Sequence, residues 1–407
     1  MSSLAFKIFG NNEDREKWDK HAEHADAVEE FTDGEKDKVK EALSYLRGPD
    51  VLGENFITRA RRSEHPLWSY FAGPVPWKLQ WLTRFAAAMR ELRDVDGFQD
   101  HMKEQIKEAE KFSERESVLE IAYKFFKAGF GVSFDPPVSV SKPRGLTGRL
   151  LSFQGAPDLK IVDGETGEEI FVEVSALGES DISKQCDRNY HLVRDILVER
   201  ALFTESLFPR ARVRRILDDD ELVELAGQLS ELVAKVKGSG EVEYLENDMI
   251  EACVAPAHQK DVPDRWAEER GIEDIPVEGP TIPLQDPFRI KRIIRKEQKQ
   301  LPSGKPGIVV ITTDWTLLFH ANGVGAVISE LEAVLRDLPQ LSGAVACCTY
   351  GGGEKEGYVA SGGPHTAVKR VTKAGLTEET VISFNPSCVV PLSDRASNKV
   401  RDAFIRG

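Results

Sequence analysis

The chain has 407 residues, a formal net charge of −14, 41% hydrophobic residues and 30% charged residues. This length predicts two or three domains, and the composition is that of an ordinary globular protein. No apolar run approaches the roughly 20 residues needed to cross a bilayer. The N-terminus also lacks the basic start and apolar stretch of a secretion signal, so we expect a cytoplasmic protein with no membrane partner.

The cysteines argue against two kinds of stabilising site. There are five, an odd number, and they are scattered without a CxxC spacing. A disulfide framework and a zinc site are therefore both unexpected, and the pattern fits a reducing compartment. We expect these residues to be small buried hydrophobic side chains.

The charge distribution leaves a nucleic-acid partner open. A net charge of −14 opposes the long-range approach of a polyanion, although local basic faces can still attract one. Two segments are locally basic, PRARVRR at 209–215 and RIKRIIRKEQK at 289–299. Composition alone neither supports nor excludes nucleic acid.

Residues 1–112 are predicted to be a helical accessory region. Thr32 or Asp33 can cap a helix over 36–47, which Gly48-Pro49 then stops. A second helix over 77–95 has large apolar residues at helical spacing, which is typical of a packed core.

A further helix is predicted over 113–130. Ser113 and Glu116 match a capping box, and Gly129 is placed to end the helix. One apolar stripe runs along it, formed by Val118, Ile121, Ala122 and Phe125. A strand follows, interrupted at Asp135-Pro136-Pro137, and the glycine-rich basic segment 142–155 is predicted to be a mobile loop.

Residues 156–177 are predicted to form a β-hairpin. DLKIV and EIFVEV alternate apolar and polar residues, and DGETGE supplies the turn. If the turn centres near 165–166, Asp158 lies opposite Glu173, with Cβ atoms roughly 4.5–5.5 Å apart. The two carboxylates would then share a face, and Ser175 would lie on that face too.

The remaining chain resumes an α/β rhythm after a less regular middle. We expect a charged helix over 180–203, an amphipathic helix over 220–236, strand-like pieces near 242–256 and then a loop-rich stretch. The basic helix 286–300, the strand 307–313, the helix 324–337 and the strand 343–349 follow. The predicted domains are the helical region 1–112, an α/β core over 113–350 with an α+β insertion at about 205–285, and a C-terminal extension over 351–407.

The paired acids suggest a metal site. Mg²⁺ prefers oxygen ligands and is commonly held by one or two carboxylates together with water and substrate phosphate. Such a cation can promote phosphodiester hydrolysis. Asp158 and Glu173 are therefore candidate ligands for Mg²⁺, or for Mn²⁺ in its place.

These residues also carry a family resemblance. An amphipathic helix with acidic residues, a strand beginning Pro157-Asp158 and a hairpin to Glu173-Val174-Ser175 resemble the PD-(D/E)xK, or restriction-endonuclease-like, nuclease superfamily. The helix and strand over 286–313 resemble the later half of that core. The resemblance implies a mixed sheet flanked by helices, Mg²⁺ dependence and hydrolysis of nucleic acid, here DNA.

The sequence departs from the family pattern at one catalytic position. Ser175 stands where the family has lysine, and a serine cannot supply the positive charge that steadies the transition state. Lys184 in the following helix is the preferred substitute, and Lys160 on the Asp158 strand is the alternative. Gln185 and Tyr190 lie on the same helix as Lys184, where packing roles are the simpler interpretation.

The acidic residue contributed by the preceding helix stays open between two positions. Glu120 has the family's spacing from Gly129 but points away from the apolar stripe, whereas Glu114 lies on the side of the stripe a turn earlier. The candidate catalytic set is thus Asp158, Glu173, Glu120 or Glu114, and Lys184. The expected function is a Mg²⁺-dependent nuclease, and the alternative is an inactive nuclease-fold protein that binds nucleic acid or protein.

Overall fold

The computed structural model describes residues 18–53, 56–63, 65–71, 73–99, 105–136, 157–178, 181–272, 275–280, 286–313, 323–351, 358–361, 365–373 and 375–406. The chain divides into two compact units. The first comprises Met1–Gly178 and Gln285–Gly407, and the second comprises Glu179–Leu284. Within the described ranges, no helix is long and apolar enough to cross a membrane.

The N-terminal part of the first unit is helical, as the periodicity predicts. Its helices are α2 (Trp18–Asp26), α3 (Asp33–Arg47), α4 (Phe56–Arg62), α5 (Trp68–Phe71), α6 (Pro76–Glu91), the 3₁₀ turn η3 (Gln105–Lys107) and α7 (Phe112–Lys127). Thr32 caps α3 in a complete capping box with Glu35. Gly129 ends α7 with a φ of +84°, a conformation that glycine adopts without a steric penalty.

The predicted capping box of α7 is wrong. The helix begins one residue earlier, at Phe112, and its N-cap Lys111 makes no side-chain capping bond. Ser113 is therefore already inside the first turn, where its carbonyl oxygen accepts from the Ser117 hydroxyl at 2.9 Å.

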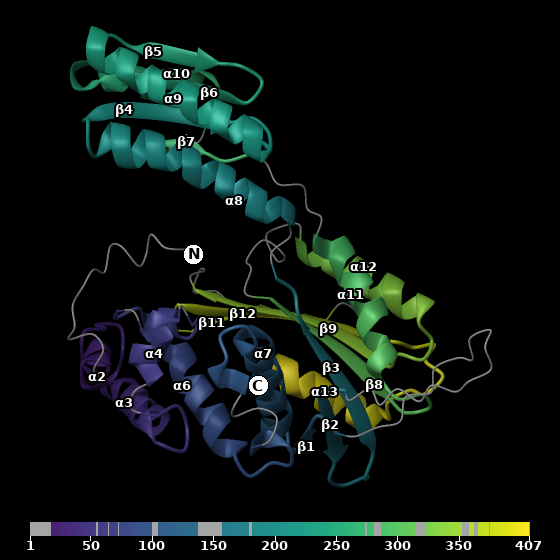
Figure 1. Ribbon diagram of the computed structural model, residues 1–407. Coiled ribbons are helices and arrows are strands. Elements are labelled where there is room, and N and C mark those ends of the chain that lie inside the picture. The colour runs from purple at the N-terminus through teal and green to yellow at the C-terminus, as the bar shows by residue number, and fades with distance from the viewer. Residues whose placement is uncertain are drawn as a thin grey trace, which may run out of the picture. The chain divides into compact units, whose positions relative to one another are not determined.

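The centre of the first unit is a mixed sheet of eight strands. They are β1 (Phe130–Phe134), β2 (Leu159–Asp163), β3 (Glu169–Ala176), β8 (Gly307–Thr313), β9 (Gly343–Gly351), β10 (Tyr358–Ser361), β11 (Thr366–Lys373) and β12 (Leu376–Phe384). Their order is β1-β2-β3-β8-β9-β12-β11-β10. The β3–β8 and β8–β9 pairs are parallel and the others are antiparallel. The fold is thus mixed α/β (Figure 1).

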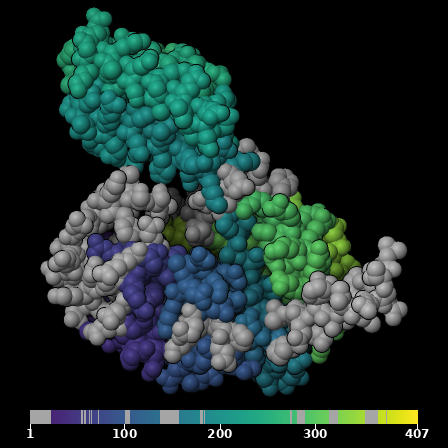
Figure 2. Space-filling model, viewed as in Figure 1, coloured from purple at the N-terminus to yellow at the C-terminus, as the bar shows by residue number. Residues whose placement is uncertain are grey.

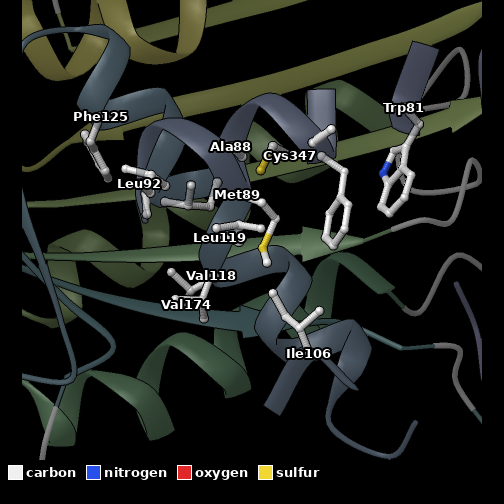
Figure 3. Close-up of a cluster of buried hydrophobic side chains, with 14 of the residues drawn as sticks. Trp81, Ala88, Met89, Leu92, Ile106, Val118, Leu119, Phe125, Val174 and Cys347 are labelled. Atoms are coloured by element: carbon white, nitrogen blue, oxygen red, sulfur yellow. The ribbon is translucent and has the colours of Figure 1, made fainter. Parts of the chain in front are cut away.

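Helices cover both faces of this sheet because its central strands are apolar on both sides. Ile308 and Val310 of β8 pack with α6, α7 and α13 (Asp394–Ile405), whereas Val309 and Ile311 pack with α11 (Asp286–Glu297) and α12 (Gly323–Asp337). Figure 3 shows part of the first core, in which Val174 of β3 joins residues of α6 and α7. Successive residues of β8 therefore belong alternately to the two cores on either side of the sheet.

The segment after residue 350 contributes to this sheet. Although the sequence suggested short strands in a C-terminal extension, β12 pairs along its length with β9 and so lies inside the sheet order. The last helix, α13, is tied to the β2–β3 hairpin by Lys399, whose Nζ donates to the buried Asp163 carboxylate at 2.8 Å.

The second unit has its own sheet and core. It contains α8 (Asp181–Arg194), the π-helix η4 (Asp195–Leu202), β4 (Leu207–Val213), α9 (Asp219–Ser239), β5 (Glu243–Glu246), β6 (Ile250–Pro256), η5 (Ala257–Gln259), α10 (Asp261–Glu269) and β7 (Val277–Glu278). The strand order is β5-β6-β4-β7. Its atoms, teal in Figure 2, pack closely among themselves. Helix α10 lies in the stretch that was expected to be rich in loops.

The unit is inserted between β3 and α11 of the first unit. The parts of the first unit that flank the insertion are hydrogen-bonded to each other, because the Arg289 side chain of α11 donates to the Gly178 carbonyl oxygen at 2.9 Å. The sequence placed this insertion at about 205–285, whereas the compact unit begins at Glu179 and includes α8.

Candidate metal centre

The β2–β3 hairpin brings Asp158 and Glu173 together. Its register pairs Leu159 with Val172 and Lys160 with Phe171, so Asp158 and Glu173 are the next pair along. Directly opposed residues have Cβ atoms roughly 4.5–5.5 Å apart. The predicted hairpin is confirmed, and its register places Asp158, the residue just before β2, next to Glu173 of β3.

The side on which they lie is set by the strand alternation. Val172 and Val174 belong to the core beneath α6 and α7, so Glu173 between them points to the opposite face, toward α11. Here it meets the end of α11 and the turn η6 (Gln298–Gln300). The Gln300 amide nitrogen lies 2.7 Å from Glu173 Oε1 and 2.7 Å from Glu297 Oε2.

Asp158 is held by the neighbouring backbone and by a cation. Its Oδ2 accepts from the Val174 N–H at 2.9 Å, and its own N–H donates to the Glu173 carboxylate. The Arg115 guanidinium of α7 lies 3.7 Å from Asp158 Oδ1 and 3.6 Å from Asp135 Oδ1. The two acids therefore have fixed positions, with Oδ1 of Asp158 only loosely paired.

Burial of like charges perturbs both acids. Asp158 is 9% exposed, and Glu173 and Glu297 are each 5% exposed. Loss of hydration, reinforced by the charges of Asp158 and Glu297, raises the pKa of Glu173 to about 9. Burial also raises the pKa of Asp158 to about 7, although Arg115 acts in the opposite direction. Clustered carboxylates of this kind need a proton or a cation to be stable together.

One carboxylate oxygen of the cluster is left without a hydrogen bond to any residue that the structure describes. Glu173 Oε2 is buried and has no hydrogen-bond partner among the described residues. A hard divalent cation fits such an oxygen, since carboxylate oxygens are its usual ligands. In the ranges that the structure covers, no three His, Cys, Asp or Glu side chains already converge as a preformed metal cage. The candidate centre is therefore the Asp158–Glu173 pair.

The two candidate glutamates of α7 lie in different surroundings. Glu114 is exposed and paired with Arg115 at 3.5 Å, close enough to Asp158 to contribute to its raised pKa. Glu120 instead contacts Arg84 at 3.3 Å and Lys124 at 3.5 Å. Burial opposes its ionisation, but these cations outweigh that effect and lower its pKa. The structure thus brings Glu114 toward the pair and places Glu120 in a separate ion cluster.

The candidate lysines lie in different units of the chain. Lys184 is an exposed residue of α8 and belongs to the second unit, which is described by itself. Lys160 lies 3.7 Å from Glu169 Oε1, toward the turn of the hairpin. Ser175 is half-buried on β3. Gln185, on the same helix as Lys184, donates to the Leu217 carbonyl oxygen at 2.8 Å within the second unit, which is a packing role.

The first basic segment is a strand whose arginines are already paired. Residues 209–215 form most of β4 and the turn after it, and each arginine has an acidic partner within the second unit. The pairs are Arg210–Asp264 (2.7 Å), Arg212–Glu278 (2.9 Å), Arg214–Glu246 (2.7 Å) and Arg215–Glu221 (2.7 Å). The locally basic run in the sequence is therefore balanced by acidic residues of the same unit.

Sequence reasoning missed four residues at the acidic pair. Arg115, Lys296, Glu297 and Gln300 come from α7, α11 and η6. Lys296 Nζ donates to Glu297 Oε1 at 2.9 Å while its side chain stays 78% exposed. The hydrogen bond to Glu297, together with the charges of Glu173 and Glu114, raises the pKa of Lys296. The one available signal was the acidic Glu297 inside an otherwise basic helix.

Comparison of the chain with protein-family models, with curated proteins and with solved structures found no match. Function is therefore argued from the geometry of the acidic pair and its surroundings.

Proposed function

We propose that the chain is a divalent-metal-dependent nuclease with a restriction-endonuclease-like core, that Asp158 and Glu173 hold the cation, and that DNA is the substrate. One observation carries the proposal. Two buried carboxyl groups lie close together at the β2–β3 hairpin, and Glu173 Oε2 has no partner in the described part of the chain. A divalent cation can take the place of the protons that such a buried acidic pair would otherwise need.

The order of the elements supports the same assignment. Helix α7, the antiparallel strands β1, β2 and β3, helix α11 and the parallel strand β8 follow one another, with the second unit inserted after β3. This order agrees with the one that the PD-(D/E)xK resemblance implies, with Asp158 just before β2 and Glu173 within β3.

The surrounding residues have distinct tasks in this proposal. A bound Mg²⁺ or Mn²⁺ would supply a Lewis acid that neutralises charge at a scissile phosphate. Asp158 and Glu173 would bind it from the side of α11, and Arg115 would keep Asp158 oriented. Lys296, exposed beside the cluster, would bring the positive charge that Ser175 lacks, and so would contact a phosphate oxygen.

A second function has one specific observation in its favour. Ser175 occupies the position of the family lysine, and a chain that had lost this charge would bind cation and nucleic acid without cutting. This alternative is an inactive nuclease-fold binding module. It differs from the first proposal in its cleavage activity and shares the metal site.

The test is calorimetric titration of Mg²⁺ and Mn²⁺ into the full chain and into Asp158→Asn/Glu173→Gln, with cleavage of single- and double-stranded DNA measured in parallel. Glu169→Gln is the matched control, because Glu169 lies on the same strand but pairs with Lys305 at 3.1 Å. We expect one divalent cation to bind wild type and the control, and the double variant to lose at least about tenfold in affinity.

The outcomes separate the two functions. Metal-dependent cleavage that the double variant abolishes supports the nuclease. Cation and DNA binding without cleavage supports the inactive module. Wild type that binds neither cation at millimolar concentration would overturn both.

A further inference from the structure

The turn that follows α11 makes an unusual contact with the acidic pair. Gln300 directs one amide nitrogen at two carboxylate oxygens, Glu173 Oε1 and Glu297 Oε2, each at 2.7 Å. Glu173 and Glu297 come from a strand and a helix that are separated in sequence by the whole inserted unit. The amide therefore links two buried acids that would otherwise repel each other.

Glu297 is buried next to Glu173, an acid of the same charge type. It is 5% exposed, and its charge adds to the burial that keeps Glu173 from ionising. Lys296 donates a hydrogen bond to Glu297 Oε1 only, while Glu297 Oε2 accepts from Gln300. A like-charged neighbour at this depth costs stability unless a proton, a hydrogen-bond donor or a cation comes between the two acids.

The two ends of the Gln300 amide have different chemistry, and each suits a different state of the site. The NH₂ end donates hydrogen bonds to both glutamates and so fills the position between them. The other end is a carbonyl oxygen, which is itself a good ligand for a hard cation. A half-turn of the amide exchanges the two ends without moving the backbone.

We propose that Glu297 is a further ligand of the cation held by Asp158 and Glu173, and that Gln300 is the residue that positions the two glutamates for it. Without a cation the amide N–H groups hold the glutamates together. When a divalent cation binds, the amide turns its carbonyl oxygen toward it and releases both carboxylates to the ion. This inference rests on the metal site of the proposed function and adds two residues to it.

The experiment measures Mn²⁺ and Mg²⁺ affinity of the full chain by calorimetry, together with the rise in melting temperature that each cation produces. Glu297→Gln keeps the shape of the side chain and removes its charge, and Gln300→Ala removes the amide. Gln298→Ala is the matched control, because Gln298 lies in the same turn and accepts from Gln340 at 2.6 Å, away from the acids.

We expect Glu297→Gln to weaken cation affinity by about 10- to 100-fold, as loss of a ligand or of its supporting contact usually does. Gln300→Ala should weaken it by a smaller factor, and Gln298→Ala should leave it unchanged. Both site variants should also show a smaller cation-induced rise in melting temperature. Should Glu297→Gln fail to fold, Glu297→Asp tests the same contact in another way, since it keeps the charge but withdraws the carboxylate by one methylene, and it should also weaken cation affinity.

The possible results distinguish this inference from the proposal beneath it. If wild type binds no cation, both fall together. If Asp158→Asn/Glu173→Gln abolishes binding while Glu297→Gln and Gln300→Ala bind as wild type does, the metal site stands and the roles of Glu297 and Gln300 are refuted. A Gln300→Ala variant that is less stable but has unchanged affinity would show a purely structural tie.

Discussion

Replacing Glu173 by glutamine should make the metal-free protein less sensitive to rising pH. The folded chain keeps a proton on Glu173 up to a pKa of about 9, whereas the unfolded chain releases it near 4.5. Between these values the folded state binds more protons than the unfolded state, so stability is greatest at low pH and falls as the pH rises. Glutamine resembles the protonated acid and does not titrate.

The size of the effect follows from proton counting. While one state holds a proton that the other has lost, each pH unit changes the unfolding free energy by about 1.4 kcal/mol. From pH 6 to pH 8, wild type should therefore lose about 3 kcal/mol more than Glu173→Gln does. Asp158 titrates in the lower part of the same window, with a pKa of about 7, and adds to the wild-type slope.

The assay is urea unfolding at pH 6, 7 and 8, in the presence of a chelator so that no cation occupies the acids. Glu169→Gln is again the control, because its ion pair with Lys305 lowers its pKa and it is ionised throughout this range. Wild-type and Glu173→Gln stabilities that fall in parallel with pH would refute the reasoning. That result would mean that Glu173 is hydrated and ionised in the folded state.

Two further predictions concern stability away from the acidic pair. Asn385→Ala should lower the unfolding free energy by about 1–3 kcal/mol, because the buried amide donates to three backbone carbonyl groups at and after the end of α12, at 2.8, 3.2 and 3.0 Å. Urea unfolding measures it, and a change within about 0.5 kcal/mol would contradict it. Lys399→Met should destabilise the chain at neutral pH. The difference from wild type should shrink as acid protonates Asp163, whose pKa Lys399 lowers to about 2. Circular dichroism between pH 5 and 2 tests this, and a difference independent of pH would be the contrary result.

Local patterning was enough to predict the hairpin that carries the acids. The alternation in β2 and β3 and the turn between them fixed which residues oppose each other, so Asp158 and Glu173 could be paired before any coordinates existed. The buried strands β8 and β9 were predicted for a similar reason, because both are short continuous apolar runs.

The rest of the site depends on contacts between distant elements. Glu297 and Gln300 reach Glu173 only because α11 packs against the sheet and β8 runs parallel to β3. The only local mark of Glu297 is that it is an acid after a run of lysine and arginine, and no local pattern marks Gln300. The Arg115–Asp158 contact likewise depends on how α7 packs, which spacing along one helix does not determine.

Local charge did not reveal strand β4 (Leu207–Val213) or the ion pairs that its arginines make. The run at 209–215 has four arginines, yet the arginines at 210 and 212 alternate with buried apolar residues in β4 and pair with acids across the second unit. Acidic partners that lie far away in sequence are invisible to a count of local charge. Strand β4 was not predicted, although its residues alternate between buried and half-buried positions.

The interrupted crossover between β3 and β8 has a kinetic consequence. Pairing Phe171 with Gly307 closes a loop that contains the whole second unit. The entropy of closing a flexible loop grows only logarithmically, so lengthening a roughly 30-residue crossover fourfold costs about 1 kcal/mol in stability. Folding rate is more sensitive to such distant contacts than stability is. Glu173 and Glu297, which Gln300 links, should therefore come together late in folding, after the inserted unit has ordered and brought its two ends together.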